Sequence, residues 1–189
     1  MKKIILSAIM MMATAGAFAQ HAVGSFTIQS RFGMNIANVT DVDGSDPRIA
    51  FAVGPELEYQ ATNWMSLALS MMYSAQGCKM DDITAKIDYL NFPLVANFYV
   101  LKGLAVKAGI QPGFKLSVKA NNAEVNDSFV NGFDLSIPVG LSYEYKNFVL
   151  DGRWNVGATK ILKDDVDVIE GIKAQNTVFQ ITLGYKFGL

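Results

Sequence analysis

The chain has 189 residues, of which 51% are hydrophobic and 17% are charged, and its formal net charge is −1. This length fits a single domain of roughly 100 to 200 residues, and the near-neutral charge gives no electrostatic case for nucleic-acid binding. Beyond the N-terminal region, no unbroken apolar run reaches the roughly 20 residues of a membrane-spanning helix.

The N-terminal region is typical of a secretory signal peptide. Two lysines stand before an apolar run that begins at Ile4, and small residues precede Gln20. We therefore expect residues 1–19 to be a signal peptide that is cleaved before Gln20, leaving 20–189 as the mature domain. The alternative, a membrane anchor, needs a longer apolar run than this one.

Eight later segments alternate polar and apolar residues with a period of two. A strand with this period has one apolar and one polar face. Their ranges are 26–36, 49–60, 65–74, 89–99, 104–118, 133–145, 148–159 and 179–187.

The two faces differ in chemistry along every segment. In 104–118, for example, one parity runs from Leu104 through Ile110 to Val118, and the other includes Lys107, Lys115 and Ser117. Single-chain bacterial barrels have an even number of strands, an apolar outer face and a polar interior. The sequence therefore predicts an all-β fold, a transmembrane eight-stranded antiparallel up-and-down β-barrel.

A secreted soluble barrel is the main structural alternative, because it also alternates. Its polarity would be reversed, with large apolar side chains around a central ligand and polar side chains in water. The candidate inward set here consists of glycine, alanine, serine and charged residues, which would make a poor apolar cavity.

Loop lengths alternate along the chain. Long hydrophilic connections are expected at 38–48, 77–83, 119–127 and 160–175, and tight turns at 61–63, 101–103 and 146–147. Short turns face the periplasm and long loops face outward in outer-membrane barrels, so both termini should lie at the periplasmic end.

Several segments carry motifs of a known family. They are 67–77, 89–94, 148–157 and 179–187, with Gly33–Ile36 in addition. Together they resemble the PorT-like "porin family" of outer-membrane barrels over nearly the whole mature chain. The resemblance implies an eight-stranded outer-membrane barrel and brings no shared catalytic residues. Gly188 and Leu189 follow the terminal aromatic, Phe187, which departs from the usual assembly signal.

Enzymatic chemistry has little support in the residues. The single histidine, His21, lies next to the expected cleavage site, and hydrolases usually need an imidazole to activate a nucleophile. Carboxylate pairs such as Glu56 with Glu58, or Asp151 with Glu144, are the remaining alternative. We expect no enzyme activity and no cofactor.

Balanced charges on the inward face form the candidate site. Charges enclosed in a narrow barrel must pair or be hydrated, so we expect a structural, salt-bridged network in the lumen; the alternative is an ion-selective pore. The residues are Arg31, Glu56, Glu58, Lys107, Lys115, Asp134, Glu144, Asp151, Arg153 and Lys186. The expected pairs are Arg31 with Glu56, Lys107 with Glu144, and Lys115 with Asp134.

Two acidic runs, 41–46 and 164–170, superficially resemble calcium loops. The first lacks the glycine and glutamate that an EF-hand requires at its sixth and twelfth positions, so solvated turns are favoured over bridging of divalent ions to lipopolysaccharide. Cys78, the single cysteine, is expected in an external loop without an internal disulfide partner, and intermolecular pairing is the alternative.

We therefore expect an integral outer-membrane protein of a Gram-negative bacterium with a structural or surface-interaction role. Lipid and lipopolysaccharide are the expected partners, together with an unidentified loop partner. A narrow porin is the first alternative; an outer-leaflet enzyme and a secretion-associated barrel are further ones.

Overall fold

The computed structural model describes residues 21–40, 45–80, 83–121, 123–124, 130–159, 161 and 175–188. The expected signal peptide, the acidic run 164–170 and most of the acidic run 41–46 lie outside these residues. The part of the chain that the structure describes contains no membrane-spanning helix.

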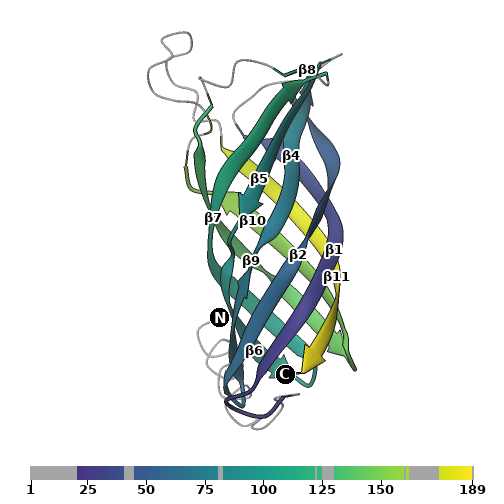
Figure 1. Cartoon of the computed structure of the whole chain (residues 1–189), viewed down its shortest axis with the longest axis vertical. Coiled ribbons are helices and arrows are strands. Elements are labelled where there is room, and N and C mark those ends of the chain that lie inside the picture. The colour runs from purple at the N-terminus through teal and green to yellow at the C-terminus, as the bar shows by residue number, and fades with distance from the viewer. Residues whose placement is uncertain are drawn as a thin grey trace, which may run out of the picture.

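The strands form one antiparallel sheet that closes on itself (Figure 1). In chain order they are β1 (Phe26–Val39), β2 (Ser45–Thr62), β3 (Met65–Ser70), β4 (Met72–Met80), β5 (Ile83–Asn91), β6 (Leu94–Leu101), β7 (Leu104–Ala120), β8 (Ala123–Glu124), β9 (Phe133–Tyr145), β10 (Phe148–Gly157) and β11 (Asn176–Gly188). β1 pairs with both β2 and β11, which closes the ring.

The barrel has eight strands, two of which are interrupted. β3 and β4 are the two parts of one barrel strand, which is interrupted at Met71. β5 and β6 are the two parts of another, which is interrupted by Phe92 and Pro93. Proline has no N–H for a sheet ladder, which accounts for the second interruption. β8 is a short addition to β7. The predicted eight-stranded up-and-down barrel is confirmed.

The polarity of the wall is that of a membrane barrel. Large apolar side chains stand on the outer face, including Phe32 at 63% and Ile49 at 67% exposure. The inward positions are polar, and Arg31 and Glu56 are only 2% and 1% exposed. This arrangement excludes the soluble alternative, because that fold would bury its apolar set.

The three predicted tight turns lie at one end of the barrel. Lys102 and Gly103 join β6 to β7, and Lys146 and Asn147 join β9 to β10. Gly103 and Lys146 have φ angles of 82° and 56°, the left-handed conformation that such short connections use. Figure 1 shows β8 at the opposite end of the barrel.

The strands near β8 are longer than the sequence predicts. Ser45–Arg48 belongs to β2, and Gly77–Met80 belongs to β4, although both were expected in loops. Cys78 is therefore a buried strand residue, 4% exposed, and its expected place in an external loop is wrong. Beyond the apolar belt both faces of a strand meet polar surroundings, so apolar and polar residues no longer alternate there. Strand pairing can continue in such a segment without a period of two in the sequence.

The parity of β7 changes near its end. The β5–β7 register shifts between Asp88 and Tyr89, so that Ser117 is opposite Asp88 and Val118 is opposite Ile87. Val118 consequently packs against the buried Ile87 cluster inside the barrel, and its predicted outward orientation is wrong. A β-bulge of this kind inserts one residue and reverses the facing of all that follow.

Candidate functional site in the barrel interior

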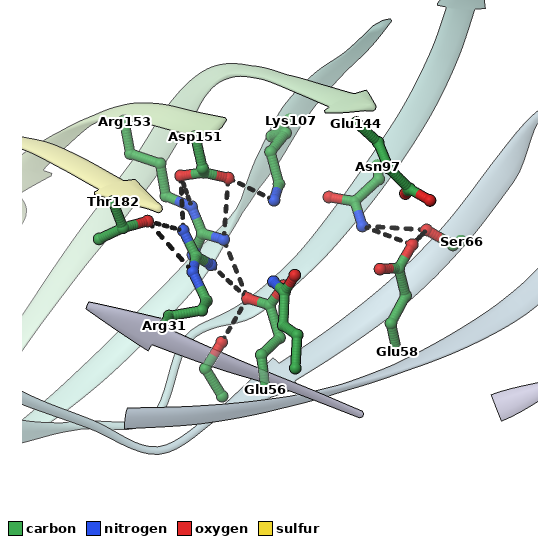
Figure 2. Close-up of polar contacts among 12 residues, drawn as sticks. Arg31, Glu56, Glu58, Ser66, Asn97, Lys107, Glu144, Asp151, Arg153 and Thr182 are labelled. Atoms are coloured by element: carbon green, nitrogen blue, oxygen red, sulfur yellow. Dashed lines mark hydrogen bonds and ion pairs between the residues drawn. The ribbon is translucent and has the colours of Figure 1, made fainter. Parts of the chain in front are cut away.

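Five charged side chains meet in the centre of the barrel (Figure 2). Arg31 lies on β1, Glu56 on β2, Lys107 on β7, and Asp151 and Arg153 on β10. None is more than 3% exposed. Each occupies an inward position of its strand, so the period-two pattern of the sequence brings all five to the same lumen.

Glu56 is bound from two sides of the barrel. Its Oε2 lies 2.5 Å from Arg31 Nη1 and 2.9 Å from Arg153 Nη2. Ser70 Oγ donates to the same oxygen at 2.6 Å, and Gln29 Nε2 donates to Oε1 at 2.6 Å. The carboxylate thus ties β1, β2, β3 and β10 together.

Asp151 is the second anion of the cluster. Its Oδ2 accepts a hydrogen bond from Lys107 Nζ at 2.5 Å. Its Oδ1 makes ion-pair contacts with Arg31 Nη2 at 2.7 Å and Arg153 Nε at 2.8 Å, although neither is aligned as a hydrogen bond. Arg31 Nη2 donates instead to Thr182 Oγ1 at 2.6 Å.

The cluster is not neutral. Three cations, Arg31, Lys107 and Arg153, face two anions, Glu56 and Asp151, so the formal charge is 3 − 2 = +1. Within this cluster, removing a carboxylate leaves more unpaired charge than removing one basic residue, so the two carboxylates should matter more to stability than any one basic residue.

A second cluster lies toward the tight-turn end. Lys186 Nζ lies 2.6 Å from Glu144 Oε2 and 2.9 Å from Glu58 Oε2. Tyr99 OH donates to Glu58 Oε1 at 2.6 Å, and His21 Nε2 lies 3.0 Å from Glu144 Oε1. The segment before β1 is thereby held against the interior of the barrel.

The opposite end of the lumen is capped by apolar side chains. Ile87, Tyr89 and Ile161 form a buried cluster, on which Val118 and other valines pack. Asn131 N donates to Ile161 O at 2.7 Å, which anchors Ile161 beside the start of β9. This cap was not predicted, because Ile161 lies in the segment 160–175 that is expected to form a hydrophilic connection.

The three pairs expected from the sequence have different outcomes. Arg31 and Glu56 are in contact, as described above. Lys107 contacts Asp151 rather than Glu144. Lys115 and Asp134 bind other groups: Lys115 Nζ donates to Val130 O at 3.0 Å, while Asn176 and Thr159 each donate to Asp134 Oδ1 at 3.3 Å.

Several polar partners were not singled out from the sequence. Gln29, Ser70, Thr182 and Tyr99 all contribute hydrogen bonds to the charged residues. Each stands at an inward position of a predicted strand, so parity was the signal that could have identified them.

The single histidine of the chain lies outside the central cluster. His21 Nε2 lies 3.0 Å from Glu144 Oε1 at the tight-turn end. Within the described ranges, no three histidine, cysteine or acidic side chains are grouped to hold a metal ion.

Comparisons with known proteins agree with this architecture. The chain is similar to Ail, the attachment invasion locus protein of Yersinia pestis, with 13% identity, coverage of 88% of this chain and 100% of Ail, and a TM-score of 0.51. The chain is also similar to Neisserial surface protein A, with 13% identity, coverage of 86% of this chain and 97% of that protein, and a TM-score of 0.55.

These structural likenesses concern the fold. No curated protein shows significant sequence similarity to the chain. Residues 18–163 match the family described as "Outer membrane protein beta-barrel domain", which places the protein in the outer membrane. The chain therefore belongs to the outer membrane protein beta-barrel domain family.

Proposed function

We propose that this outer-membrane barrel serves as a structural or surface-interaction protein whose interior is closed by its own side chains. The observation that carries this proposal is the central cluster, in which Glu56 and Asp151 join residues from β1, β7 and β10 across the lumen. An eight-stranded barrel is only wide enough for side chains to fill.

Opening a path through this centre would separate several buried ion pairs at once. Arg31 and Arg153 each contact both carboxylates, so moving either guanidinium breaks two contacts. Removing one partner of a buried ion pair lowers stability by about 3–5 kcal/mol, because the other charge is left unpaired. This cost favours a closed interior over the narrow porin that is the alternative function.

Planar-bilayer recording tests the proposal directly. We expect the refolded wild-type barrel to be electrically silent. The double variant Asp151→Ala/Arg153→Ala removes one charge of each sign and widens the lumen, so it should conduct. Leu150→Ala, on the outer face of the same strand, is the matched control and should stay silent. Wild-type current steps as large as those of the double variant would establish a porin.

We also propose that the chain is not an enzyme. Two facts support this: the single histidine is engaged by Glu144, and the central carboxylates are each surrounded by basic groups. Intact lipid A and intact peptide after incubation with the refolded barrel are the expected results. Release of fatty acid or peptide fragments would contradict the proposal.

Within its family we assign the chain to the PorT-like group, on the motifs at 89–94, 148–157 and 179–187. A secretion-associated role is not transferred with this assignment.

We further propose that residues 1–19 are removed on export. N-terminal sequencing of protein purified from outer membranes should begin at Gln20, and a sequence beginning at Met1 would contradict the proposal.

For partners, we propose outer-membrane lipid and lipopolysaccharide around the apolar wall and a protein partner at the end near β8. The strands β2, β4 and β7 extend there beyond the alternating segments, which supports a surface for interactions. Lipopolysaccharide that stays with the purified barrel through mild detergent extraction is the expected observation.

A further inference from the structure

A groove lies in the outer wall of the barrel. It lies over β9, β10 and β11, has a volume of about 590 Å³, and also reaches Leu104 at the start of β7. Its walls include Leu141, Tyr143, Leu150, Trp154, Phe179 and Ile181. All six side chains are on the outer face, between 39% and 57% exposed.

The groove exists because a glycine occupies an outward position. Gly152 lies between Leu150 and Trp154 on β10, opposite Leu141 on β9 and Ile181 on β11. A Cβ placed on Gly152 would meet no atom within 4 Å. The surrounding outward positions carry large side chains, so the missing side chain leaves a depression in an otherwise continuous apolar wall.

Of the wall residues named above, Tyr143 carries a hydroxyl and Trp154 carries an indole N–H, and the other four are wholly apolar. Asp151 and Ser142 line it, but both are buried, and the Asp151 carboxylate lies in the central charge cluster; they contribute backbone. The indole Nε1 of Trp154 donates to Thr177 Oγ1 at 2.9 Å, which satisfies the one polar atom of that ring and fixes its orientation. The lining therefore favours a mainly apolar occupant.

The position of the groove identifies the leaflet. Leu104 follows the tight turn at Lys102 and Gly103, and Leu150 is close to the tight turn at Lys146 and Asn147. Tight turns face the periplasm in outer-membrane barrels, so the groove begins near the periplasmic interface and runs toward the middle of the membrane. The inner leaflet of this membrane consists of phospholipid.

We propose that the groove over Gly152 holds one acyl chain of a phospholipid from the periplasmic leaflet. The chain contacts the backbone of β10 at Gly152, between the side chains of Leu141 and Ile181. An apolar depression within the hydrocarbon layer is filled by the surrounding medium, and a flexible acyl chain can follow its length. This inference is independent of whether the lumen conducts.

Solution NMR of the barrel in nanodiscs of dimyristoyl phosphatidylcholine tests the proposal. Deuterated, ¹⁵N-labelled protein in protonated lipid should give a cross-peak between acyl methylenes and the Gly152 amide. Ala96, an outward residue of β6 on another part of the wall, is the reference, because its own Cβ separates lipid from the backbone. We expect the Gly152 cross-peak to be clearly stronger.

Two variants make the test specific. Gly152→Leu fills the groove, so the cross-peak at residue 152 should fall to the level at Ala96. Ala96→Leu adds the same side chain elsewhere and should leave the Gly152 cross-peak unchanged. Equal cross-peaks at Gly152 and Ala96 in the wild-type protein would overturn the proposal without any variant.

A second copy of the barrel is the competing occupant. In a mixture of labelled and unlabelled protein in deuterated lipid, contacts between copies would give protein cross-peaks at the Gly152 amide. We expect none. Their appearance would overturn the acyl-chain assignment and identify the groove as an interface between copies.

Discussion

Arg31 Nη1 lies 2.5 Å from Glu56 Oε2, although the β1–β2 register places Gly54, and not Glu56, directly opposite Arg31. The contact is diagonal: the long arginine side chain reaches along the lumen to the next inward position of β2. Because Gly54 presents no side chain, it does not block this path. Pairing in the barrel is therefore governed by the reach of side chains across the interior as well as by strand register.

The net charge of the central cluster predicts unequal effects of removing an anion and a cation. Asp151→Asn leaves three cations against Glu56 alone, and we expect it to lower the free energy of unfolding by about 3–5 kcal/mol. Lys107→Met leaves two cations and two anions, so its cost should be much smaller. Urea unfolding in detergent micelles, followed by tryptophan fluorescence, measures both.

Lys79→Met is the control for this comparison, because Lys79 is exposed on β4 and contributes no charge to the lumen. It should leave stability nearly unchanged. If Asp151→Asn and Lys107→Met destabilise the barrel equally, the excess positive charge does not determine the stability of the cluster.

A double-mutant cycle distinguishes the observed partner of Lys107 from the expected one. Lys107 Nζ lies 2.5 Å from Asp151 Oδ2, so Lys107→Ala and Asp151→Ala should show a coupling of about 0.5–3 kcal/mol. Lys107→Ala and Glu144→Ala should be additive within about 0.5 kcal/mol, because Glu144 contacts Lys186 in the second cluster. The opposite ranking would restore the pair expected from the sequence.

The sequence carries much of the fold and the composition of the lumen, because a period of two assigns each residue to one face of a strand. Arg31, Glu56, Lys107, Asp151 and Arg153 could all be placed inside on parity alone. Which of them meet could not be predicted, since Arg153 and Glu56 approach across the lumen from strands that are not neighbours.

Two other features could not be predicted from the alternation of polar and apolar residues. A bulge reversed the facing of Val118, and it could not be seen in the sequence because the alternation of Lys115, Leu116, Ser117 and Val118 continues without a break. Ile161 was assigned to a hydrophilic loop, yet it packs on Ile87 and Tyr89. Such a contact depends on the path of a connection in space, which periodicity does not describe.

Two glycines on adjacent strands should respond oppositely to the same substitution. A Cβ at Gly140 would lie 2.1 Å from Gly152 O, whereas a Cβ at Gly152 would meet no atom within 4 Å. Gly140→Ala must therefore displace β10 and should destabilise the barrel by about 1–3 kcal/mol. Gly152→Ala should be neutral or stabilising by up to about 1 kcal/mol.

Each variant is the control of the other, because both remove one glycine from the same pair of strands. The temperature at which the folded band shifts on a denaturing gel gives the comparison. Equal shifts for both variants would mean that the close approach of β9 and β10 at Gly140 is relieved without cost.

The bulge in β7 predicts which of two adjacent positions can be labelled. Ser117 faces outward, where its hydroxyl donates to Asp88 Oδ2 at 3.1 Å, while Val118 packs inside against Ile87. In a Cys78→Ala background, Ser117→Cys should therefore react with a water-soluble maleimide much faster than Val118→Cys. Uninterrupted alternation along β7 would give the reverse order, since Val118 would then share the outer face of Leu116.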